Sequence, residues 1–336
     1  MADDVLDVIE SAYRFDGDDR SWLDRIARAM QRHIDPRKHG VAAFLYTLGS
    51  DGRVTPGDVL CYDIDEPYST MIGQIPLSLP PWYVRQTFAQ HPCASAVHTG
   101  DVAARTLTRT SMKEAFGTVG WRDLLVVNGL DPTGHGVYVA AVRRSARPLA
   151  RIAQNRLTRV AVHLAAAFRL RRALRDVGVR GLDGAEAVLT PAGTIEHARD
   201  PARTRQARQA LTHAARAIER ARTRRGRRDA DRSIAEWTGL IAARWSLVDH
   251  FESDGKRWLV ARQNDVADVG RAELSPRELQ AVAFAALGHG NKLIAYEMGI
   301  AAETVRVLLH RAARKLGART RDELILRARL TFTPTV

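Results

Sequence analysis

Residues 274–330 read LSPRELQAVAFAALGHGNKLIAYEMGIAAETVRVLLHRAARKLGARTRDELILRARL, and this stretch decides both the fold and the function that we expect of the chain. It opens with Ser-Pro-Arg-Glu at 275–278, which supplies a helix N-cap, a proline at the first helical position and the glutamate of a capping box. Gly288 and Gly290 end this first helix. A short second helix stops at Gly299, because glycine readily takes the left-handed conformation that terminates helices.

A third helix is expected over about 302–316, with Gly317 as its C-terminal cap, and a second capping box at 320–323 starts a fourth helix. Two short helices joined by a tight turn that contains glycine form a helix-turn-helix unit. The second helix of such a unit enters the major groove of DNA with its N-terminal residues at the base edges. One face of this helix carries Arg306, Val307 and His310, and the opposite side carries Val305, Leu309 and Ala312.

This arrangement resembles the LuxR/GerE family of helix-turn-helix proteins, over essentially all of 274–330 and without a gap. Five segments at fixed spacings carry the resemblance, namely LSPRE at 274–278, NKLIA at 291–295, MGI at 298–300, ETVR at 303–306 and RKLG at 314–317. The family binds DNA as a dimer and regulates transcription. The resemblance therefore implies a DNA-binding domain at 271–332, double-stranded DNA as a partner, and a homodimer.

The resemblance also assigns roles to individual residues. The positions that read bases are Arg306, Val307 and His310. The positions at or near the DNA backbone are Asn291, Lys292, Thr304, Arg314 and Lys315, and Arg311 is a further cation placed to reach phosphates. Arginine pairs with guanine and a valine methyl group contacts the thymine methyl in the usual chemistry of base edges. The family further implies that Glu278 is structural and pairs with a basic residue of the third helix.

Two residues depart from the family pattern. Leu308 stands where many members have histidine, so the run at 307–309 is unusually apolar. Ala301 stands where serine or threonine often caps the recognition helix, and the loss of such a cap costs roughly 1 kcal/mol. These departures leave the base contacts open but not the fold.

The first part of the chain alternates helical and strand-like patterns. Residues 5–34 are expected to be helical in two pieces, and 41–48 and 54–62 are expected to pair as strands. Loops and short helices are expected over 63–120, above the sheet. A second strand pair follows at 124–127 and 137–142, and then a long helix begins near Pro148.

This order of elements resembles a GAF domain, a small-molecule-sensing fold, over about residues 8–145. The resemblance implies a ligand pocket between the sheet and residues 63–120. Candidate lining residues are Trp82, Tyr83, Phe88, His91, Cys93 and Trp121. Each aromatic side chain is also compatible with an ordinary core position. His91 and Cys93 lack partners at the spacing of a zinc site, so we expect no metal.

Between these two regions, residues 148–178 form a connecting helix with an apolar stripe, which either pairs with its copy in a dimer or packs on its own domain. Residues 184–264 combine a strand pair, helices at 201–225 and 233–243, and a second strand pair, and they resemble a PAS domain. A spacer or dimerisation role fits this segment better than cofactor binding. The expected fold class is therefore multidomain: α+β GAF-like and PAS-like sensor domains at 1–147 and 184–264, followed by an all-α four-helix LuxR-type domain.

The charge of the chain is a weaker guide than these patterns. The net charge is +13, but 22 Arg against 7 acidic residues lie at 141–230, whereas 11 Lys and Arg against 6 acidic residues lie at 271–330. A basic protein admits a nucleic-acid partner. Because most of the excess lies upstream of the helix-turn-helix, the capping boxes and glycine stops carry the DNA-binding prediction instead.

Other classes of protein lack support in the sequence. No apolar run approaches the ~18 residues of a membrane span, and the acidic N-terminus does not resemble a signal peptide. Two isolated cysteines suit a reducing cytosol. No nucleotide-binding loop or catalytic constellation is recognisable, and Asp3 and Asp4 precede a helix rather than follow a receiver strand. We therefore expect a cytoplasmic protein that is not an enzyme and has no cofactor.

These patterns predict a sequence-specific transcription regulator whose DNA-binding domain is controlled by a small-molecule ligand or a partner at the N-terminal domains, with RNA polymerase as a further partner. The alternative is a ligand-regulated protein-interaction module whose last domain docks on RNA polymerase or another regulator without reading DNA. A selection from random duplex DNA discriminates between the two.

Overall fold

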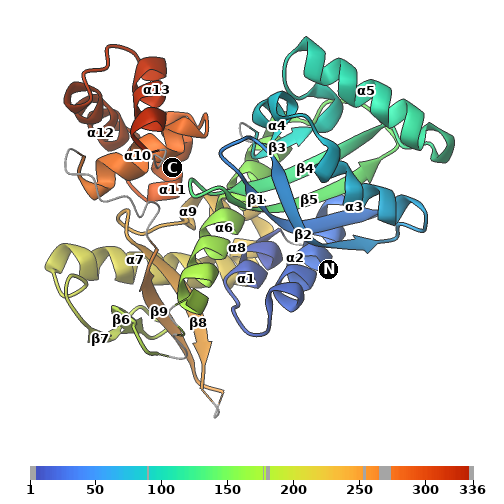
Figure 1. The fold of residues 1–336 in the computed structure, drawn as a ribbon. Helices are drawn as coiled ribbons and strands as arrows, with labels where there is room; N and C mark the ends of the chain where they lie inside the picture. Colours follow the sequence, from blue (N-terminus) through green and yellow to red (C-terminus); the bar gives the residue numbers. More distant parts are fainter. Residues whose placement is uncertain are drawn as a thin grey trace. The chain divides into compact units, whose positions relative to one another are not determined.

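The computed structural model describes residues 5–88, 91–176, 178, 182–252, 255–264 and 274–332, and Asp3 and Asp4 lie outside this part. The chain divides into two compact units (Figure 1). Unit 1 comprises residues 1–130 and 134–165, and unit 2 comprises residues 131–133 and 166–336. Among the described helices, none combines the length and hydropathy that a membrane crossing requires.

Unit 1 is built on a five-stranded antiparallel sheet in the order β2-β1-β5-β4-β3. The strands are β1 Val41–Leu48, β2 Val54–Tyr62, β3 Cys93–Ser95, β4 Asp123–Leu130 and β5 His135–Arg143. The first pair has the bounds that the sequence predicts, and the second pair is longer than predicted. In the centre of the sheet Phe44 of β1 lies opposite Tyr138 of β5, and both residues line a cavity of unit 1.

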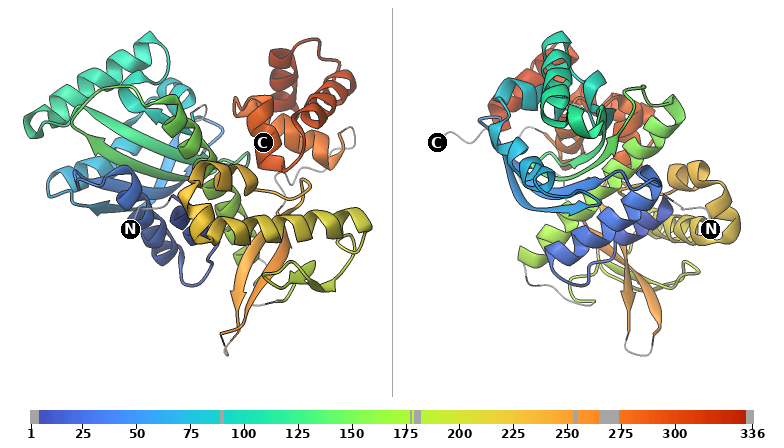
Figure 2. Two further views of the ribbon diagram at one scale, coloured as in Figure 1. Left: turned by 180° about the vertical axis from the view of Figure 1, so that it is seen from behind. Right: turned by 90° about the vertical axis from the view of Figure 1, so that its right-hand side faces the viewer.

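Helices cover both faces of this sheet. They are α1 Leu6–Ala12, α2 Asp19–Ile34, α3 Tyr68–Ser78, α4 Pro81–Thr87 and α5 Val102–Phe116. Figures 1 and 2 place α1 and α2 on one face and α5 on the other. The expectation of loops and short helices over 63–120 was wrong for α5, which has 15 residues. The carboxylate of Asp101 caps this helix by accepting from the Ala104 amide at 2.9 Å.

The long helix α6 Arg151–Asp176 follows β5 and passes from unit 1 into unit 2 at residue 166. It lies so close to β4 that a Cβ atom added to Gly129 would be 2.6 Å from the Ala161 carbonyl oxygen. The apolar stripe of α6 is buried within the chain at Leu157, Val160 and Leu164. Of the two alternatives for this stripe, the structure favours packing on its own chain.

Unit 2 contains a four-stranded antiparallel sheet in the order β7-β6-β9-β8. The strands are β6 Ala187–Leu189, β7 Ile195–Ala198, β8 Trp245–Phe251 and β9 Arg257–Gln263, and the helices between them are α7 Arg205–Arg222, α8 Arg224–Arg228 and α9 Ala230–Glu236. The helix expected at 233–243 was wrong in its second half. The chain leaves the helix after Glu236, and Ala242 and Ala243 take left-handed backbone conformations with φ of 50° and 57°.

The last four helices of unit 2 are α10 Pro276–Ala286, α11 Asn291–Met298, α12 Ala302–Lys315 and α13 Arg321–Phe332. The capping box at the start of α10 is present: Glu278 donates its amide to Ser275 Oγ at 3.4 Å, and Ser275 donates its amide to Glu278 Oε2 at 2.7 Å. Gly299 ends α11 with φ of 60°. The core of this domain is apolar and includes Phe284, Ile294, Met298, Val305, Leu309 and Leu324.

Candidate nucleic-acid interface

Helix α12 separates an inward face from an outward face. Val305 and Ala312 are fully buried and Leu309 is 8% exposed, so these residues join α12 to the core of the domain. Because side chains three and four residues apart lie on the same side of a helix, His310 shares the exposed face with both Val307 and Arg306. Val307 is 36% exposed although it is apolar, and a methyl-bearing side chain at such a position is available to contact a base.

The outward guanidinium of Arg306 is held by a neighbour on its own helix. Its Nε atom donates to both carboxylate oxygens of Glu303 at 3.0 Å, and both side chains are 68% exposed. The hydrogen bond from Arg306 lowers the pKa of Glu303, and the same bond raises the pKa of Arg306. An exposed pair of this kind contributes little free energy, so Arg306 can exchange Glu303 for another acceptor.

The cation at the end of α12 has a different environment. Lys315 Nζ lies 2.7 Å from Glu278 Oε2, and the Glu278 side chain is only 5% exposed. Burial opposes the ionisation of Glu278, but hydrogen bonds from Lys315 and Ser275 outweigh it and lower the pKa of the carboxyl. Lys315 thus contacts the acidic residue that the sequence marks as structural, and it remains 44% exposed beside the interface.

Further predicted contact residues lie around the N-termini of α11 and α12. Asn291 Oδ1 accepts from Arg321 at 2.8 Å, which fixes the start of α11 to α13. Lys292 and Thr304 are exposed. Arg311 and Arg314 are exposed as well, and neither these arginines nor Lys292 forms an ion pair with any described carboxylate. These three cations are therefore available for phosphates.

Leu308 points toward another part of unit 2. It is 7% exposed and belongs to an apolar cluster that also contains Leu240 and Ala243. Together with Thr304 and Arg311 it lines one side of a cleft of about 630 Å³. Other residues lining this cleft are Pro201, Thr204, Ala242, Trp245, Pro276 and Arg277. The apolar residue that departs from the family pattern thus faces a neighbouring segment of the chain.

The segment 237–243 docks directly on the helix-turn-helix, a contact that sequence reasoning missed. The Tyr296 hydroxyl lies 2.7 Å from the carbonyl oxygens of both Ile234 and Trp237. The Ala243 amide donates to the Met298 carbonyl at 2.6 Å. These bonds join the Tyr296 side chain and the Ala243 amide to carbonyls far apart in sequence, so no local pattern signals them. Tyr296 is half-buried within α11 in the structure, but nothing around it in the sequence marks it as a docking residue.

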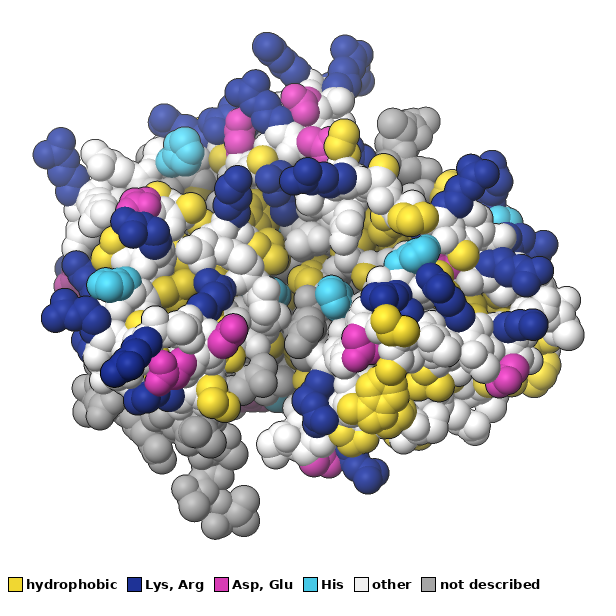
Figure 3. Space-filling model, turned by 90° about the horizontal axis from the view of Figure 1, so that it is seen from above, with side chains coloured by type: hydrophobic (Ala, Val, Ile, Leu, Met, Phe, Trp, Pro, Cys, Tyr) yellow, Lys and Arg dark blue, Asp and Glu magenta, His cyan; other side chains and the backbone are white. Residues whose placement is uncertain are grey.

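Basic side chains do not form a single patch on the face that Figure 3 shows. Figure 3 shows Lys and Arg spread over one face, with acidic side chains among them. Part of the Arg-rich middle of the chain is also used internally: Arg222 contacts Asp249 at 2.5 Å and is 14% exposed. The position of the charge therefore does not locate a DNA surface, and the exposed face of α12 stays the predicted one.

Unit 1 contains a separate cavity of about 310 Å³ between its sheet and the helices α3 and α5. Three residues of the predicted pocket, Tyr83, Phe88 and Trp121, line it. Trp82, which is 38% exposed, and His91, whose pKa is lowered by burial, are not among the described lining residues. Burial raises the pKa of the nearby Cys93 thiol to about 12. Among the described residues no three His, Cys, Asp or Glu side chains gather as a metal site requires.

Comparison with known proteins supports the interpretation of the last domain as a LuxR-type helix-turn-helix. A family profile described as "Bacterial regulatory proteins, luxR family" matches residues 272–328. The HTH-type transcriptional activator RamA of Corynebacterium glutamicum is 54% identical over 57 residues, which are 17% of this chain and 20% of RamA. The matched part thus spans a fifth of the length of this relative.

A solved structure of SdiA from Escherichia coli aligns with 90% of this chain and 89% of its own, with 11% identity and a TM-score of 0.24. A superposition this loose carries no conclusion about the fold of the first 270 residues. The GAF-like and PAS-like interpretations therefore stay predictions. For the last domain, the profile match, the identity to RamA and the observed helices agree, and residues 272–328 form a helix-turn-helix domain of the LuxR family.

Proposed function

We propose that this chain is a sequence-specific DNA-binding transcription regulator that places α12 in the major groove. The observation that carries the proposal is the exposed trio Arg306, Val307 and His310 on one face of α12, directly after a helix-turn-helix turn. The second helix of such a unit is the one that reads base edges. Helix α12 carries one acidic side chain, Glu303, and its charge is paired with Arg306.

The trio divides the work of base recognition by chemistry. Arg306 exchanges Glu303 for the two acceptors of a guanine, a bidentate contact that its planar guanidinium fits. Val307 contacts a thymine methyl group. His310, one turn further along the helix, is within reach of the next base step.

Phosphate contacts position the domain without reading the sequence. Lys292 at the start of α11 and Arg311 and Arg314 on α12 supply unpaired cations. Asn291 and Thr304 supply neutral hydrogen-bonding groups beside them, and Lys315 lies at the edge of the same surface. Because each neutralised phosphate releases counterions, binding weakens steeply as salt is added.

The proposal extends to the whole protein as a cytoplasmic homodimer that recognises a roughly palindromic site, since two-fold symmetry in the protein pairs with two-fold symmetry in the DNA. Control comes from a small molecule bound in unit 1, and RNA polymerase is the partner through which transcription changes. The cavity of unit 1 and the docking of residues 237–243 on α11 support a regulated rather than a constitutive DNA-binding domain.

The test is a selection from random duplex DNA on the purified full-length chain at moderate salt. We expect an enriched motif with two related half-sites. If no sequence is enriched and the protein instead captures RNA polymerase or another regulator, the interaction-module alternative replaces the proposal. An Arg306→Ala chain run in parallel controls for selection by other surfaces.

A further inference from the structure

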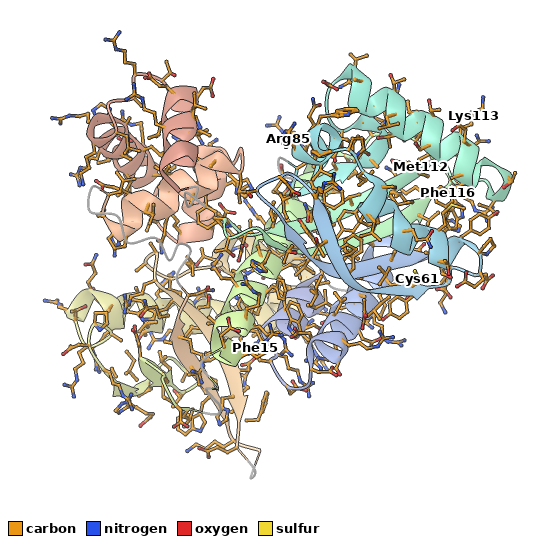
Figure 4. The ribbon with its side chains drawn as sticks, in the orientation of Figure 1. Phe15, Cys61, Arg85, Met112, Lys113 and Phe116 are labelled. Atoms are coloured by element: carbon orange, nitrogen blue, oxygen red, sulfur yellow. The ribbon has the colours of Figure 1, made fainter. Side chains whose placement is uncertain are left out.

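The cavity of unit 1 has walls from the sheet and from two of the helices that cover it. Phe44 and Tyr138 line it from strands β1 and β5, Met71 lines it from α3, and Met112 and Phe116 line it from α5. Figure 4 shows Met112 and Phe116 on the side of α5 that faces the sheet, and Lys113 on the opposite side of the same helix. The cavity thus lies between the sheet and the helices that cover one of its faces.

This space opens to solvent beside the exposed Ser78, Leu107 and Ser111, and it is large for a pocket in a small domain. Protein cores pack at the density of organic crystals, and voids larger than a water molecule are few. A volume of about 310 Å³ corresponds to the liquid volume of about ten water molecules. It reaches the range of small-molecule sites, which begins at about 300 Å³. Met71, Ile72 and Ile75 pack against the apolar cluster that contains Phe116 and Trp121, but they remain only half-buried beside the cavity.

The lining has no formal charge. None of the described residues around the cavity is Asp, Glu, Lys, Arg or His, and most are aliphatic or aromatic. An ionised ligand would lose its hydration without gaining a counterion, and that transfer is strongly unfavourable. An uncharged, largely apolar molecule instead gains roughly 25 cal/mol for each Å² of apolar surface that it buries.

The hydroxyl groups in the wall are mostly committed to the protein. Ser78 donates to the Ile75 carbonyl at 3.0 Å, and Thr108 donates to the Ala104 carbonyl at 2.9 Å. Since the Thr108 proton is used, Tyr83 is the donor in its 2.8 Å bond with Thr108. These three groups therefore have no free proton for a ligand.

The two remaining hydroxyls of the wall, those of Ser111 and Tyr138, form no hydrogen bond with any described residue; Ser111 is exposed to solvent, and Tyr138 is half-buried. Its ring is held between two others, with the Phe44 centroid at 4.7 Å and the Phe88 centroid at 5.1 Å. This stacking fixes the direction of the phenol at the cavity wall. Burial, reinforced by the nearby Tyr83, raises the pKa of Tyr138, so the hydroxyl keeps its proton near neutral pH.

We propose that this cavity binds an uncharged, mostly apolar small molecule of about ten to twenty non-hydrogen atoms that accepts one hydrogen bond from Tyr138. A carbonyl, ether or ring nitrogen supplies the acceptor. Control of transcription by this molecule rests on the proposed function, whereas its binding to unit 1 does not.

The test uses the full-length chain and prodan, an uncharged naphthalene ketone dye whose emission moves to the blue in apolar surroundings. We expect a saturable blue-shifted signal. Two compounds of equal size then compete for it, methyl naphthyl ketone and the naphthoate anion. The ketone should displace the dye at least about tenfold more effectively, because only the anion must leave its hydration behind.

Three variants locate the site. Tyr138→Phe removes only the hydroxyl and should weaken dye binding about three- to tenfold, the equivalent of one hydrogen bond. Ala115→Trp fills the cavity from α5 and should abolish binding. Lys113→Ala, on the other side of α5, is the matched control and should bind like the parent chain. Thermal unfolding of each variant shows whether it is folded. If Ala115→Trp does not fold, the proposal is tested by dye binding to Tyr138→Phe and by the competition between the ketone and naphthoate.

The proposal is overturned if neither the dye nor the ketone binds up to its solubility limit, if naphthoate competes as well as the ketone, or if folded Tyr138→Phe and Ala115→Trp chains bind like the parent. The same preparations are used for the DNA selection. Selected DNA without dye binding leaves the proposed function standing and removes the ligand class. Dye binding with the expected preference but without selected DNA leaves the ligand class standing and removes the proposed function.

Discussion

Lys315 Nζ lies 2.7 Å from Glu278 Oε2, and this contact joins the last turn of α12 to the first turn of α10. Glu278 is at the same time the capping-box residue of α10 and accepts from the Ser275 amide. One buried carboxylate therefore fixes α12 against α10.

Glu278→Gln should lower the free energy of unfolding by about 1–3 kcal/mol, less than for a fully buried ion pair because Lys315 is 44% exposed. Folding lowers the pKa of Glu278, so its stabilising effect is present above the ordinary pKa of 4.5 and is lost as the pH falls through the lowered value. Urea unfolding at several pH values measures this. The difference between parent and variant should shrink in acid, and a difference independent of pH would contradict the prediction. Glu303→Gln, at an exposed pair, is the control and should leave stability unchanged.

Arg306→Ala should relax the preference for guanine at one position of each half-site and reduce affinity for the best site about tenfold or more. Lys292→Ala is the contrasting variant. It should weaken all sequences to a similar degree and reduce the slope of log affinity against log salt by about one. Fluorescence anisotropy with a panel of single-base variants measures both. Equal losses on every sequence for both substitutions would place base reading elsewhere.

Tyr296→Phe should loosen the docking of residues 237–243 on the helix-turn-helix. The substitution removes the hydroxyl that lies 2.7 Å from the Ile234 and Trp237 carbonyls and leaves both carbonyls to find water. Hydrogen exchange at the Ala243 amide, which donates to Met298, should become faster. Tyr62→Phe is the control, because it removes a hydroxyl that donates to Asp24 in unit 1 and should leave the exchange rate of the Ala243 amide unchanged. Unaltered exchange in Tyr296→Phe would show that its hydroxyl does not hold the segment.

Asp123→Ala should destabilise unit 1 by about 3–5 kcal/mol. The carboxylate is fully buried and accepts from Arg143 at 2.8 Å, Ser95 at 2.7 Å and the Val97 amide at 3.1 Å. Its removal leaves these donors without their acceptor. Chemical denaturation of the variant measures the loss. Asp58→Asn, at a carboxylate that is 80% exposed, is the control, and similar losses in both would mean that burial does not set the cost.

Local signals account for what the sequence predicted well. The capping box at Ser275 and Glu278 and the left-handed glycines at 299 and 317 depend on neighbours only a few residues away, and the structure has them. The strand pair β1 and β2 also follows from alternation and a turn. In each case the physical cause lies within the stretch of chain that is read.

Long-range contacts account for what the sequence did not predict. The helix expected at 233–243 ends at Glu236, where the carbonyls of Ile234 and Trp237 meet the Tyr296 hydroxyl instead of continuing a helix. The cavity of unit 1 is similar, because Tyr83 and Trp121 share a wall only once α3 and α5 lie on the sheet. Trp82, the immediate neighbour of Tyr83, is 38% exposed and is not among the described lining residues, and composition alone does not distinguish the two.

Gly299 is required both by the turn after α11 and by the close approach of residue 240, and a comparison of sequences cannot separate these two requirements. A Cβ atom at this position would lie within van der Waals overlap of the Leu240 carbonyl oxygen, and the left-handed turn after α11 favours glycine in any case. Selection for the turn alone therefore preserves the space that docking needs. Tyr296 is the informative position in relatives of this chain, since its hydroxyl lies at the carbonyls of Ile234 and Trp237, where the docked segment begins. In a relative with glycine at the turn but phenylalanine at the position of Tyr296, we expect the helix-turn-helix domain not to be held by the segment that corresponds to residues 237–243.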